Sequence, residues 1–351
     1  MREEIEEILR VARDTRVSPG AVVGWIKNGE RHVVASGRLT YEADAPLVAA
    51  DTLYDVASVT KSIPLSSLVQ IALQENVLQL STKAHEILQE LTGNYHELIT
   101  VEHLLTYTAI WDMPEGISQF AKNGADALLQ ALYTVPLVAK PGETYCYTNA
   151  PALVLGLMLE KIYALPLNVI AQEKLFGPLH MSHTTFDPRA LPDDQVAPTE
   201  RIERGDVHKV VHDEAAKVLR KHGMVAGNAG VFSTASDILN YCEMVLRGGK
   251  TAEGVKLLSA MTIESFEHNY LSAIHQAASL GWELHQPRFM GNYAHAKMFG
   301  KTGFTGCVVL IDRARQTAMV LLANAQYPQR HTDKESVNQL RCDLANIVFR
   351  T

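Results

Sequence analysis

The sequence predicts an α/β protein in which both ends of the chain build one antiparallel sheet, flanked by N- and C-terminal helices. Three observations predict this fold. Strand-like segments with turn signals lie near both termini, amphipathic helical patterns lie outside them, and helical patterns with long loops fill the middle. We expect one catalytic unit over residues 1–351, with 1–75 and 281–351 in the α/β lobe and 76–280 in an inserted, mainly helical lobe.

Two hairpins justify the sheet. Residues 21–27 and 31–36 alternate apolar side chains on either side of Asn28-Gly29, which is a strong hairpin signal. Residues 307–312 and 317–323 form a second apolar pair joined by a charged turn. The sheet is therefore expected to combine segments from opposite ends of the chain.

The terminal helices follow from spacing and capping. Residues 1–16 place apolar side chains at i, i+3, i+4 and i+7, which predicts an amphipathic helix. Near the other end, Thr332 and Glu335 form a capping box, so a second helix is expected to start at Thr332. Both helices would cover the sheet.

A serine and a lysine three residues apart, Ser58 and Lys61, are the first of three short signatures. Residues 51–56 predict a short strand, and a helix is expected from about Ser58, with Pro64 in an early turn. Positions i and i+3 share one helix face, so the ammonium would lie beside the hydroxyl. A lysine of lowered pKa could then activate the serine as a nucleophile.

The other two signatures are Tyr147-Thr148-Asn149 and Lys301-Thr302-Gly303. The second is expected between two strand-like stretches, residues 293–299 and 307–311. Lys301 would be the second cation that lowers the pKa of Lys61, and Tyr147 would offer a phenol that relays or accepts the proton. Each motif alone is weak, but their order and wide spacing together predict a hydrolase site.

With these motifs the chain resembles the serine β-lactamase and penicillin-binding superfamily, especially class C β-lactamases, D-alanyl-D-alanine carboxypeptidases of that type and their esterase relatives. The resemblance covers nearly the whole chain. It extends to residues 104–106 (Leu-Leu-Thr), 176–179 (Phe-Gly-Pro-Leu), 227–234 and 303–306. It implies a β-lactamase/transpeptidase-like fold.

The resemblance also implies roles. Ser58 would be the acylated nucleophile, and Lys61 and Tyr147 would share the general acid/base work. Asn149 would orient the substrate amide or the lysine.

The Lys-Thr-Gly segment completes the implied site. Lys301 and Thr302 would bind a substrate carboxylate or tune Tyr147. The oxyanion hole would be the backbone N–H groups of Ser58 and of Phe304, the residue that follows Gly303.

The sequence departs from the family pattern at two places. Residues 106–110 (Thr-Tyr-Thr-Ala-Ile) stand where many relatives have Thr-His-Thr-Ser-Gly, and Asn228 stands where relatives often have histidine. Conversely, β-lactam-recognising members carry lysine at the position of Lys301, whereas many esterase-like relatives have histidine or tryptophan. The last detail favours a substrate that bears a carboxylate.

Composition excludes several functions. The 351 residues are 47% hydrophobic and 20% charged, which is typical of a soluble globular protein, and the net charge of −7 argues against nucleic acid as a partner. Apolar runs stay shorter than the ~20 residues that span a bilayer. An amphipathic start instead of an apolar leader predicts a cytoplasmic protein, unless a leader has been removed. The four cysteines lack CxxC spacing and are expected to be reduced thiols.

Two other patterns in the sequence do not predict a site. His208 and His212 are spaced i, i+4, but Lys209 stands where the zincin pattern needs glutamate, so no metal or other cofactor is expected. His212 is instead expected near the cleft, where it could contact substrate. Cys146, beside Tyr147, belongs to no thiol-nucleophile motif.

Three functions follow. The first is a serine hydrolase for small esters or amides, the second a class C-like β-lactamase or D-Ala-D-Ala carboxypeptidase, and the third a catalytically silent binding protein on the same scaffold. The expected partner is a small-molecule ester, amide or β-lactam, and homo-oligomer formation is left open. Turnover of p-nitrophenyl esters and of nitrocefin would discriminate between them.

Overall fold

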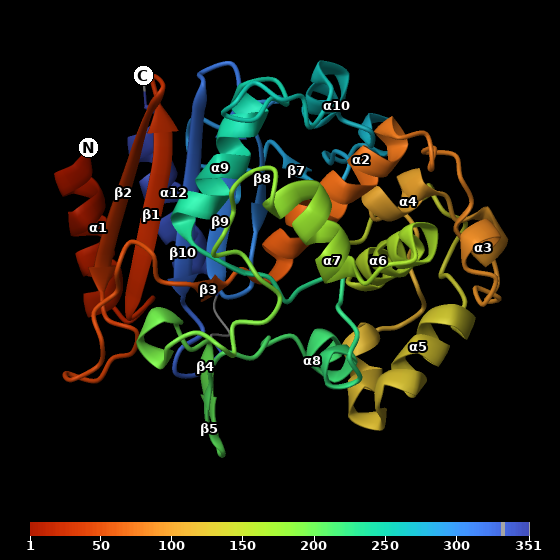
Figure 1. The fold of residues 1–351 in the computed structure, drawn as a ribbon, viewed down its shortest axis with the longest axis horizontal. Coiled ribbons are helices and arrows are strands. Elements are labelled where there is room, and N and C mark those ends of the chain that lie inside the picture. The colour runs from red at the N-terminus through yellow and green to blue at the C-terminus, as the bar shows by residue number, and fades with distance from the viewer. Residues whose placement is uncertain (331–333, 351) are drawn as a thin grey trace.

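The computed structural model describes residues 1–330 and 334–350 and contains a six-stranded antiparallel sheet with helices on both faces (Figure 1). The strands are ordered β2-β1-β10-β9-β8-β7. Their bounds are β1 (Gly20–Lys27), β2 (Glu30–Gly37), β7 (Glu283–Leu284), β8 (Phe299–Thr302), β9 (Gly306–Asp312) and β10 (Thr317–Asn324). The first and last parts of the chain meet where β1 pairs with β10, which confirms the predicted sheet.

Both predicted hairpins are present. β1 pairs with β2 from Gly20↔Gly37 to Lys27↔Glu30, and the turn residues Asn28 and Gly29 have φ of 54° and 79°. Positive φ at both central positions matches the right-handed twist of the strands, which is why Asn-Gly is favoured there. β9 pairs with β10 in the same antiparallel manner.

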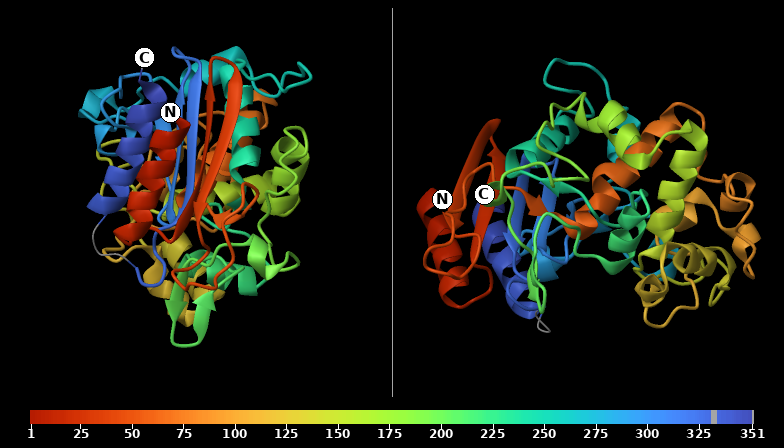
Figure 2. Two further views of the ribbon diagram at one scale, coloured as in Figure 1. Left: turned by 90° about the vertical axis from the view of Figure 1, so that its left-hand side faces the viewer. Right: turned by 60° about the horizontal axis from the view of Figure 1, so that its bottom comes forward.

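The sheet divides the hydrophobic core in two because successive side chains of a strand point to opposite faces. In β1, Val22 and Ile26 face the core shared with the helical lobe, whereas Val23 and Trp25 face the terminal helices. The terminal helices α1 (Arg2–Asp14) and α12 (Glu335–Phe349) lie side by side on this second face (Figure 2). The predicted cap residue Thr332 lies outside the described residues.

Helix α9 (Ala235–Leu246) covers the other face of the sheet, against β1 and β10. Gly24 allows this close packing, because a Cβ there would come within 2.9 Å of a methyl carbon of Leu239. The helical lobe lies beyond α9, as Figure 1 shows. Its α-helices are α2 (Ser67–Gln74), α3 (Ala84–Ile87), α4 (Val101–Leu105), α5 (Ala125–Thr134), α6 (Ala150–Tyr163), α7 (Leu167–Ala171) and α8 (Glu214–Lys221), and α10 (Ala260–Ser265) and α11 (Pro287–Met290) follow.

The prediction of one continuous helix after Ser58 is wrong. A 3₁₀ turn (Ala57–Lys61) and a π-helical turn (Ser62–Ser66) precede α2, which begins only at Ser67. Ile63 has non-helical angles (φ −123°, ψ 104°) because the proline ring that follows it disfavours the helical conformation. Pro64 therefore lies in the break before the helix and not in the helix's first turn.

Two short ribbons complete the fold: β3 (Tyr54–Asp55) with β6 (Phe232–Ser233), and β4 (Glu200–Ile202) with β5 (Gly205–Val207). Among the described residues, no single helix is long and apolar enough to cross a membrane. A sharply bent pair, α6 with the segment Leu167–Phe176, meets the length and composition criteria together. Most of this pair is buried inside the protein. All four cysteines are free thiols.

Candidate active site

Ser58 lies in the 3₁₀ turn directly after β3, close to the predicted strand-to-helix junction. The strand itself covers only two of the six residues predicted. Ala57 has a left-handed backbone (φ 51°), and its N–H donates to Oδ1 of Asp55 at 2.9 Å. In a 3₁₀ turn the side chains at i and i+3 eclipse each other, so this geometry places Lys61 over Ser58.

The Lys61 ammonium contacts the serine as the spacing predicted. Its Nζ donates to Ser58 Oγ at 2.8 Å and to the backbone oxygen of Asn228 at 3.0 Å. The side chain is 2% exposed, and burial lowers the pKa of Lys61 because a charged ammonium loses its hydration. A lysine of lowered pKa in this position can accept the serine proton once it has lost its own.

Tyr147 lies over the same serine and between two lysines. Its ring centroid is 5.2 Å from Nζ of Lys61 and 4.1 Å from Nζ of Lys301, and its phenol hydrogen-bonds to Ser58. Burial alone would raise the pKa of Tyr147, but the two ammonium groups and this hydrogen bond outweigh burial and lower it. The side chain is nevertheless 39% exposed, so a substrate in the cleft can reach it.

Lys301 is enclosed and does not line the cleft. It has no exposed surface, its Nζ is 3.4 Å from Oε1 of Glu283, and it lies 5.2 Å from the ring centroid of Tyr107. Burial alone would lower the pKa of Lys301, but Tyr107, Tyr147 and Glu283 outweigh it and raise the pKa. Lys301 therefore remains a fixed cation beside the tyrosine, which favours the tuning role over direct contact with a carboxylate.

The strand that carries Lys301 differs from the prediction. Residues 293–298 form turns, and β8 begins only at Phe299, so Lys301 lies within the strand and not between two strands. The apolar pattern of residues 293–299 predicts a strand, but Tyr293 and Met298 pack in the core beside the terminal helices and lie outside the strands that the structure describes. His295 instead bonds to Asp312 at 3.0 Å.

The predicted oxyanion-hole residues lie on two segments in close contact. A Cβ at Gly303 would come within 2.4 Å of the backbone oxygen of Val56, so glycine is required for β8 to end beside the Ser58 turn. Arg341 of α12 holds this end by donating to the backbone oxygen of Gly303 at 2.7 Å. In the turn that follows, the amides of Gly303 and Gly306 bond to backbone carbonyls and that of Phe304 does not.

A cleft of about 380 Å³ opens in front of these groups. Ser58, Tyr147, Thr302, Gly303 and Phe304 line it, as predicted for residues that contact substrate. Arg288 and Lys334 bring positive charge to the same cleft.

Asn149 lies beside Tyr147 but is engaged elsewhere. Its Nδ2 donates to Oδ2 of Asp213 at 3.2 Å, while Asp213 Oδ1 caps α8 through the N–H of Ala216. Lys61 is held by the Asn228 carbonyl. The arrangement thus links Asn149 to α8 rather than to the lysine.

His212 is buried behind the cleft and does not line it. Its N–H and Nδ1 lie 3.0 and 2.8 Å from Oδ2 of Asp55, and its ring stacks on Phe304 at a centroid distance of 5.3 Å. His212 is therefore not placed to contact a substrate, contrary to the prediction from the sequence. It instead links Asp55, before the Ser58 turn, to Phe304. The other histidine of the pair, His208, bonds to the Val196 carbonyl.

Sequence reasoning missed four groups that complete the site: the side chains of Asp55, Tyr107 and Glu283, and the carbonyl of Asn228. Tyr107, Glu283 and the Asn228 carbonyl act across long sequence separations, so local spacing carried no signal for them. Asp55 is close to Ser58 in sequence, but its pairing with His212 is long-range. Tyr107 lies in the segment 106–110, which departs from the family pattern. Its left-handed backbone (φ 58°) now places the Tyr107 ring against Tyr147, at a centroid distance of 4.9 Å.

We expect Lys301→Met to move the rising limb of the pH profile of kcat/KM to higher pH. Removing this cation raises the pKa of both Lys61 and Tyr147, since Lys301 lowers both. A shift of one pH unit would lower kcat/KM at neutral pH by about tenfold. Hydrolysis of a p-nitrophenyl ester from pH 5 to 10 measures this. Arg288→Gln is the control, because Arg288 pairs with the same Glu283; equal profiles for both variants would contradict the prediction.

We expect the buried Asp55–His212 pair to stabilise the fold most strongly at low pH. Burial alone would lower the pKa of His212, but Asp55 outweighs it and raises the pKa. The contribution of the pair to the free energy of unfolding is therefore complete below the pKa of His212 in the unfolded state, which is about 6.5. It is lost as the pH rises through the higher pKa of His212 in the folded state. Asp55→Asn should cost about 3–5 kcal/mol near pH 6. Urea unfolding at several pH values tests this, and a cost that grows with pH would contradict it.

Fold and site together bring a serine, a buried lysine and a tyrosine into contact beside one cleft. Residues 5–341 match the Beta-lactamase family, so the chain belongs to that family, whose members are serine hydrolases. The match covers nearly the whole chain and confirms the resemblance found in the sequence.

Two curated bacterial relatives are named as a carboxypeptidase and an amidase. A provisionally named D-alanyl-D-alanine carboxypeptidase of Escherichia coli O157:H7 is 27% identical over 326 residues, covering 82% of this chain and 74% of the relative. An N-acetylmuramyl-L-alanine amidase of Bacillus subtilis (strain 168) is 25% identical over 367 residues, covering 96% and 80%.

Solved structures confirm the predicted fold. EstCE1, described as a hydrolase with promiscuous acyltransferase activity, has a TM-score of 0.77 at 19% identity and covers 98% of both chains. The D-alanine carboxypeptidase AmpC from Burkholderia cenocepacia has a TM-score of 0.75 at 20% identity and covers 99% of this chain and 98% of its own.

Proposed function

We propose that this serine hydrolase works through an acyl-enzyme on Ser58 and acts on small esters or amides. One observation carries the proposal: Nζ of the buried Lys61 lies 2.8 Å from Ser58 Oγ. This distance permits direct proton transfer, and the lowered pKa of Lys61 makes the lysine a usable base.

The proposed cycle has two halves. Ser58 Oγ attacks the substrate carbonyl carbon while its proton passes to Lys61 or Tyr147. The carbonyl oxygen becomes an oxyanion between the N–H groups of Ser58 and Phe304, each worth about 3–4 kcal/mol of barrier. The C–O or C–N bond then breaks, and the alcohol or amine leaves with the proton. Water attacks the resulting ester in the same way, releasing a carboxylic acid and free Ser58.

The cleft gives mixed evidence on the substrate. Lys301, which suggested a carboxylate-bearing substrate in the sequence, is fully buried and paired with Glu283. This supports the plain ester or amide. Arg288 and Lys334 nevertheless line the cleft. Arg288 pairs with Glu283 at 2.9 Å but keeps an exposed side chain, so either cation could meet a carboxylate.

These two cations favour the second candidate function, a class C-like β-lactamase or D-Ala-D-Ala carboxypeptidase. Penicillins and D-alanyl peptides both end in a carboxylate next to the bond that is cleaved. The carboxypeptidase names among the relatives support the same candidate. A silent binding protein is disfavoured, because Ser58, Lys61 and Tyr147 are all present and in contact.

Intact mass spectrometry after brief exposure to a panel of compounds tests the proposal. The panel contains short-chain p-nitrophenyl esters, D-Ala-D-Ala peptides, a penicillin and nitrocefin. We expect an acyl adduct on Ser58 and turnover of the esters. Stable adducts or turnover confined to the β-lactams and peptides would favour the second candidate, and a protein that neither forms an adduct nor is labelled by a fluorophosphonate would contradict catalysis.

Assembly and location remain proposals. A penicillin-binding protein homologue from Pyrococcus abyssi, described as octameric, has the same fold with a TM-score of 0.73, at 20% identity. It supports the idea that this chain also forms a homo-oligomer, which light scattering would test. We retain the cytoplasm as the proposed location, to be tested by cell fractionation.

A further inference from the structure

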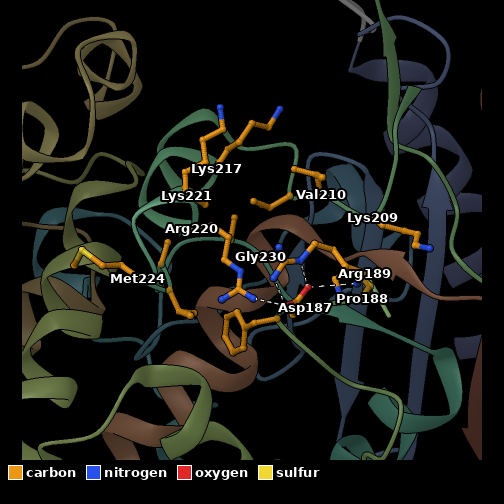
Figure 3. Close-up of a pocket in the computed structure, with 16 residues that line it drawn as sticks. Asp187, Pro188, Arg189, Lys209, Val210, Lys217, Arg220, Lys221, Met224 and Gly230 are labelled. Atoms are coloured by element: carbon orange, nitrogen blue, oxygen red, sulfur yellow. Dashed lines mark hydrogen bonds and ion pairs between the residues drawn. The ribbon is translucent and has the colours of Figure 1, made fainter. Parts of the chain in front are cut away.

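A second pocket is lined in part by residues of α8 (Figure 3). Its volume is about 200 Å³. Four chain segments line it: residues 186–189, 209–211, 216–221 and 224–230. Ser58, Lys61 and Tyr147 are not among its lining residues, so it is separate from the catalytic cleft.

The wall of this pocket is apolar and made of small side chains. Phe186, Val211 and Met224 contribute larger apolar surfaces, and Ala216 and Ala226 leave the space between them open. A Cβ at Gly230 would meet Phe186 and Val211 only at 3.7 and 3.8 Å, which is ordinary contact. The pocket therefore has room for an apolar group of a few carbon atoms and is smaller than the ~300 Å³ or more of sites for drug-sized ligands.

The rim of the pocket is strongly basic, although the chain as a whole has a net charge of −7. Five lining side chains are basic and one, Asp187, is acidic. Asp187 is already shared by Arg189 and Arg220, each at 2.6 Å, as the dashed lines in Figure 3 show. Lys209 pairs with Asp193 at 2.5 Å.

Lys217 and Lys221 are the two basic lining residues that do not pair with Asp187 or Asp193. They are one turn apart on α8, and neither ammonium group makes a hydrogen bond or ion pair in the part of the chain that the structure describes, although the charge of Lys217 helps to lower the pKa of Glu200. Figure 3 shows both side chains extending from the helix on the side away from Asp187. Two ammonium groups at the rim of an apolar cavity attract a ligand with a negative head and a short apolar body.

We propose that this pocket is a second binding site, specific for a small amphipathic carboxylate whose apolar chain fills the cavity and whose carboxylate lies between Lys217 and Lys221. The pocket lies directly behind two segments that serve catalysis. Ala229 and Gly230 follow Asn228, whose carbonyl holds Lys61, and Val211 precedes His212. A ligand there would pack against the backbone that positions the catalytic lysine.

Isothermal titration calorimetry with octanoate at low ionic strength tests the proposal. Lys217→Gln/Lys221→Gln should weaken binding by about three- to tenfold, because two partly exposed charge pairs are lost. Ala216→Leu should abolish binding by filling the cavity. Lys161→Gln, an exposed lysine on α6, is the matched control and should bind octanoate like the natural chain. Hydrolytic activity of the double lysine variant should be unchanged, since neither lysine lines the cleft.

Three results would overturn the proposal. Unchanged octanoate affinity in both the double lysine variant and Ala216→Leu would place the ligand elsewhere, including in the catalytic cleft. Equal affinity for octanamide would remove the role of the carboxylate. Equal affinity for inorganic phosphate would show a general anion site without an apolar pocket. The double lysine variant changes only surface side chains, so its result stands even where Ala216→Leu fails to fold.

Discussion

Ser58→Ala is expected to lower kcat for p-nitrophenyl ester hydrolysis by about 10⁵-fold or more, to the level of the background reaction. Removing a nucleophile that is activated by neighbouring groups has effects of this size in other serine hydrolases. The reason here is specific: Lys61 and Tyr147 both direct their polar atoms at the Ser58 hydroxyl, so without it they have no proton to move. Fluorophosphonate labelling should be lost as well.

Ser62→Ala is the matched control for this variant. Ser62 lies four residues further on, and its buried hydroxyl donates to the backbone oxygen of Gly281 at 2.6 Å. Its loss should cost about 1 kcal/mol of stability and leave activity intact. Ser58→Ala should show the reverse, with normal stability and no activity. Activity retained in Ser58→Ala would rule out the proposed nucleophile.

The sequence was sufficient to predict the central contact of the site. Ser58 and Lys61 are three residues apart, so any helical turn places them on one face, and this held although the turn is 3₁₀ rather than α-helical. The hairpins were also predictable, because Asn28-Gly29 and the alternating patterns are local signals. Both features depend on residues that are close in sequence, and this is why they could be predicted from the sequence.

Features that depend on the folded environment could not be predicted. Lys61 and Lys301 are the same residue type and both are buried, yet burial lowers the pKa of Lys61 while Tyr107, Tyr147 and Glu283 raise the pKa of Lys301. The difference comes from Glu283 and Tyr107, which reach Lys301 through tertiary packing. His212 was placed near the cleft by sequence, but only the fold shows that it pairs with Asp55 instead of facing a substrate.

The proposed function gives the two lysines complementary tasks for this reason. A base must be able to lose its proton near neutral pH, and a group that stabilises a phenolate must keep its charge. Burial suits Lys61 to the first task because desolvation lowers its pKa, and contact with Glu283 suits Lys301 to the second. Environments that push the pKa values of paired groups apart are typical of acid/base sites.

Lys61→Met is therefore expected to lower kcat/KM by about 10²–10⁴-fold, the usual contribution of a positioned general base. Stability should be retained or increased, because methionine fills a similar volume without the cost of burying an amine. Tyr147→Phe provides the comparison that separates the two candidate bases. If Lys61 takes the first proton, Lys61→Met should lose fluorophosphonate labelling of Ser58 more completely than Tyr147→Phe; if Tyr147 does, the order reverses. Full labelling rates in Lys61→Met would show that the 2.8 Å contact with Ser58 is structural and not part of the chemistry.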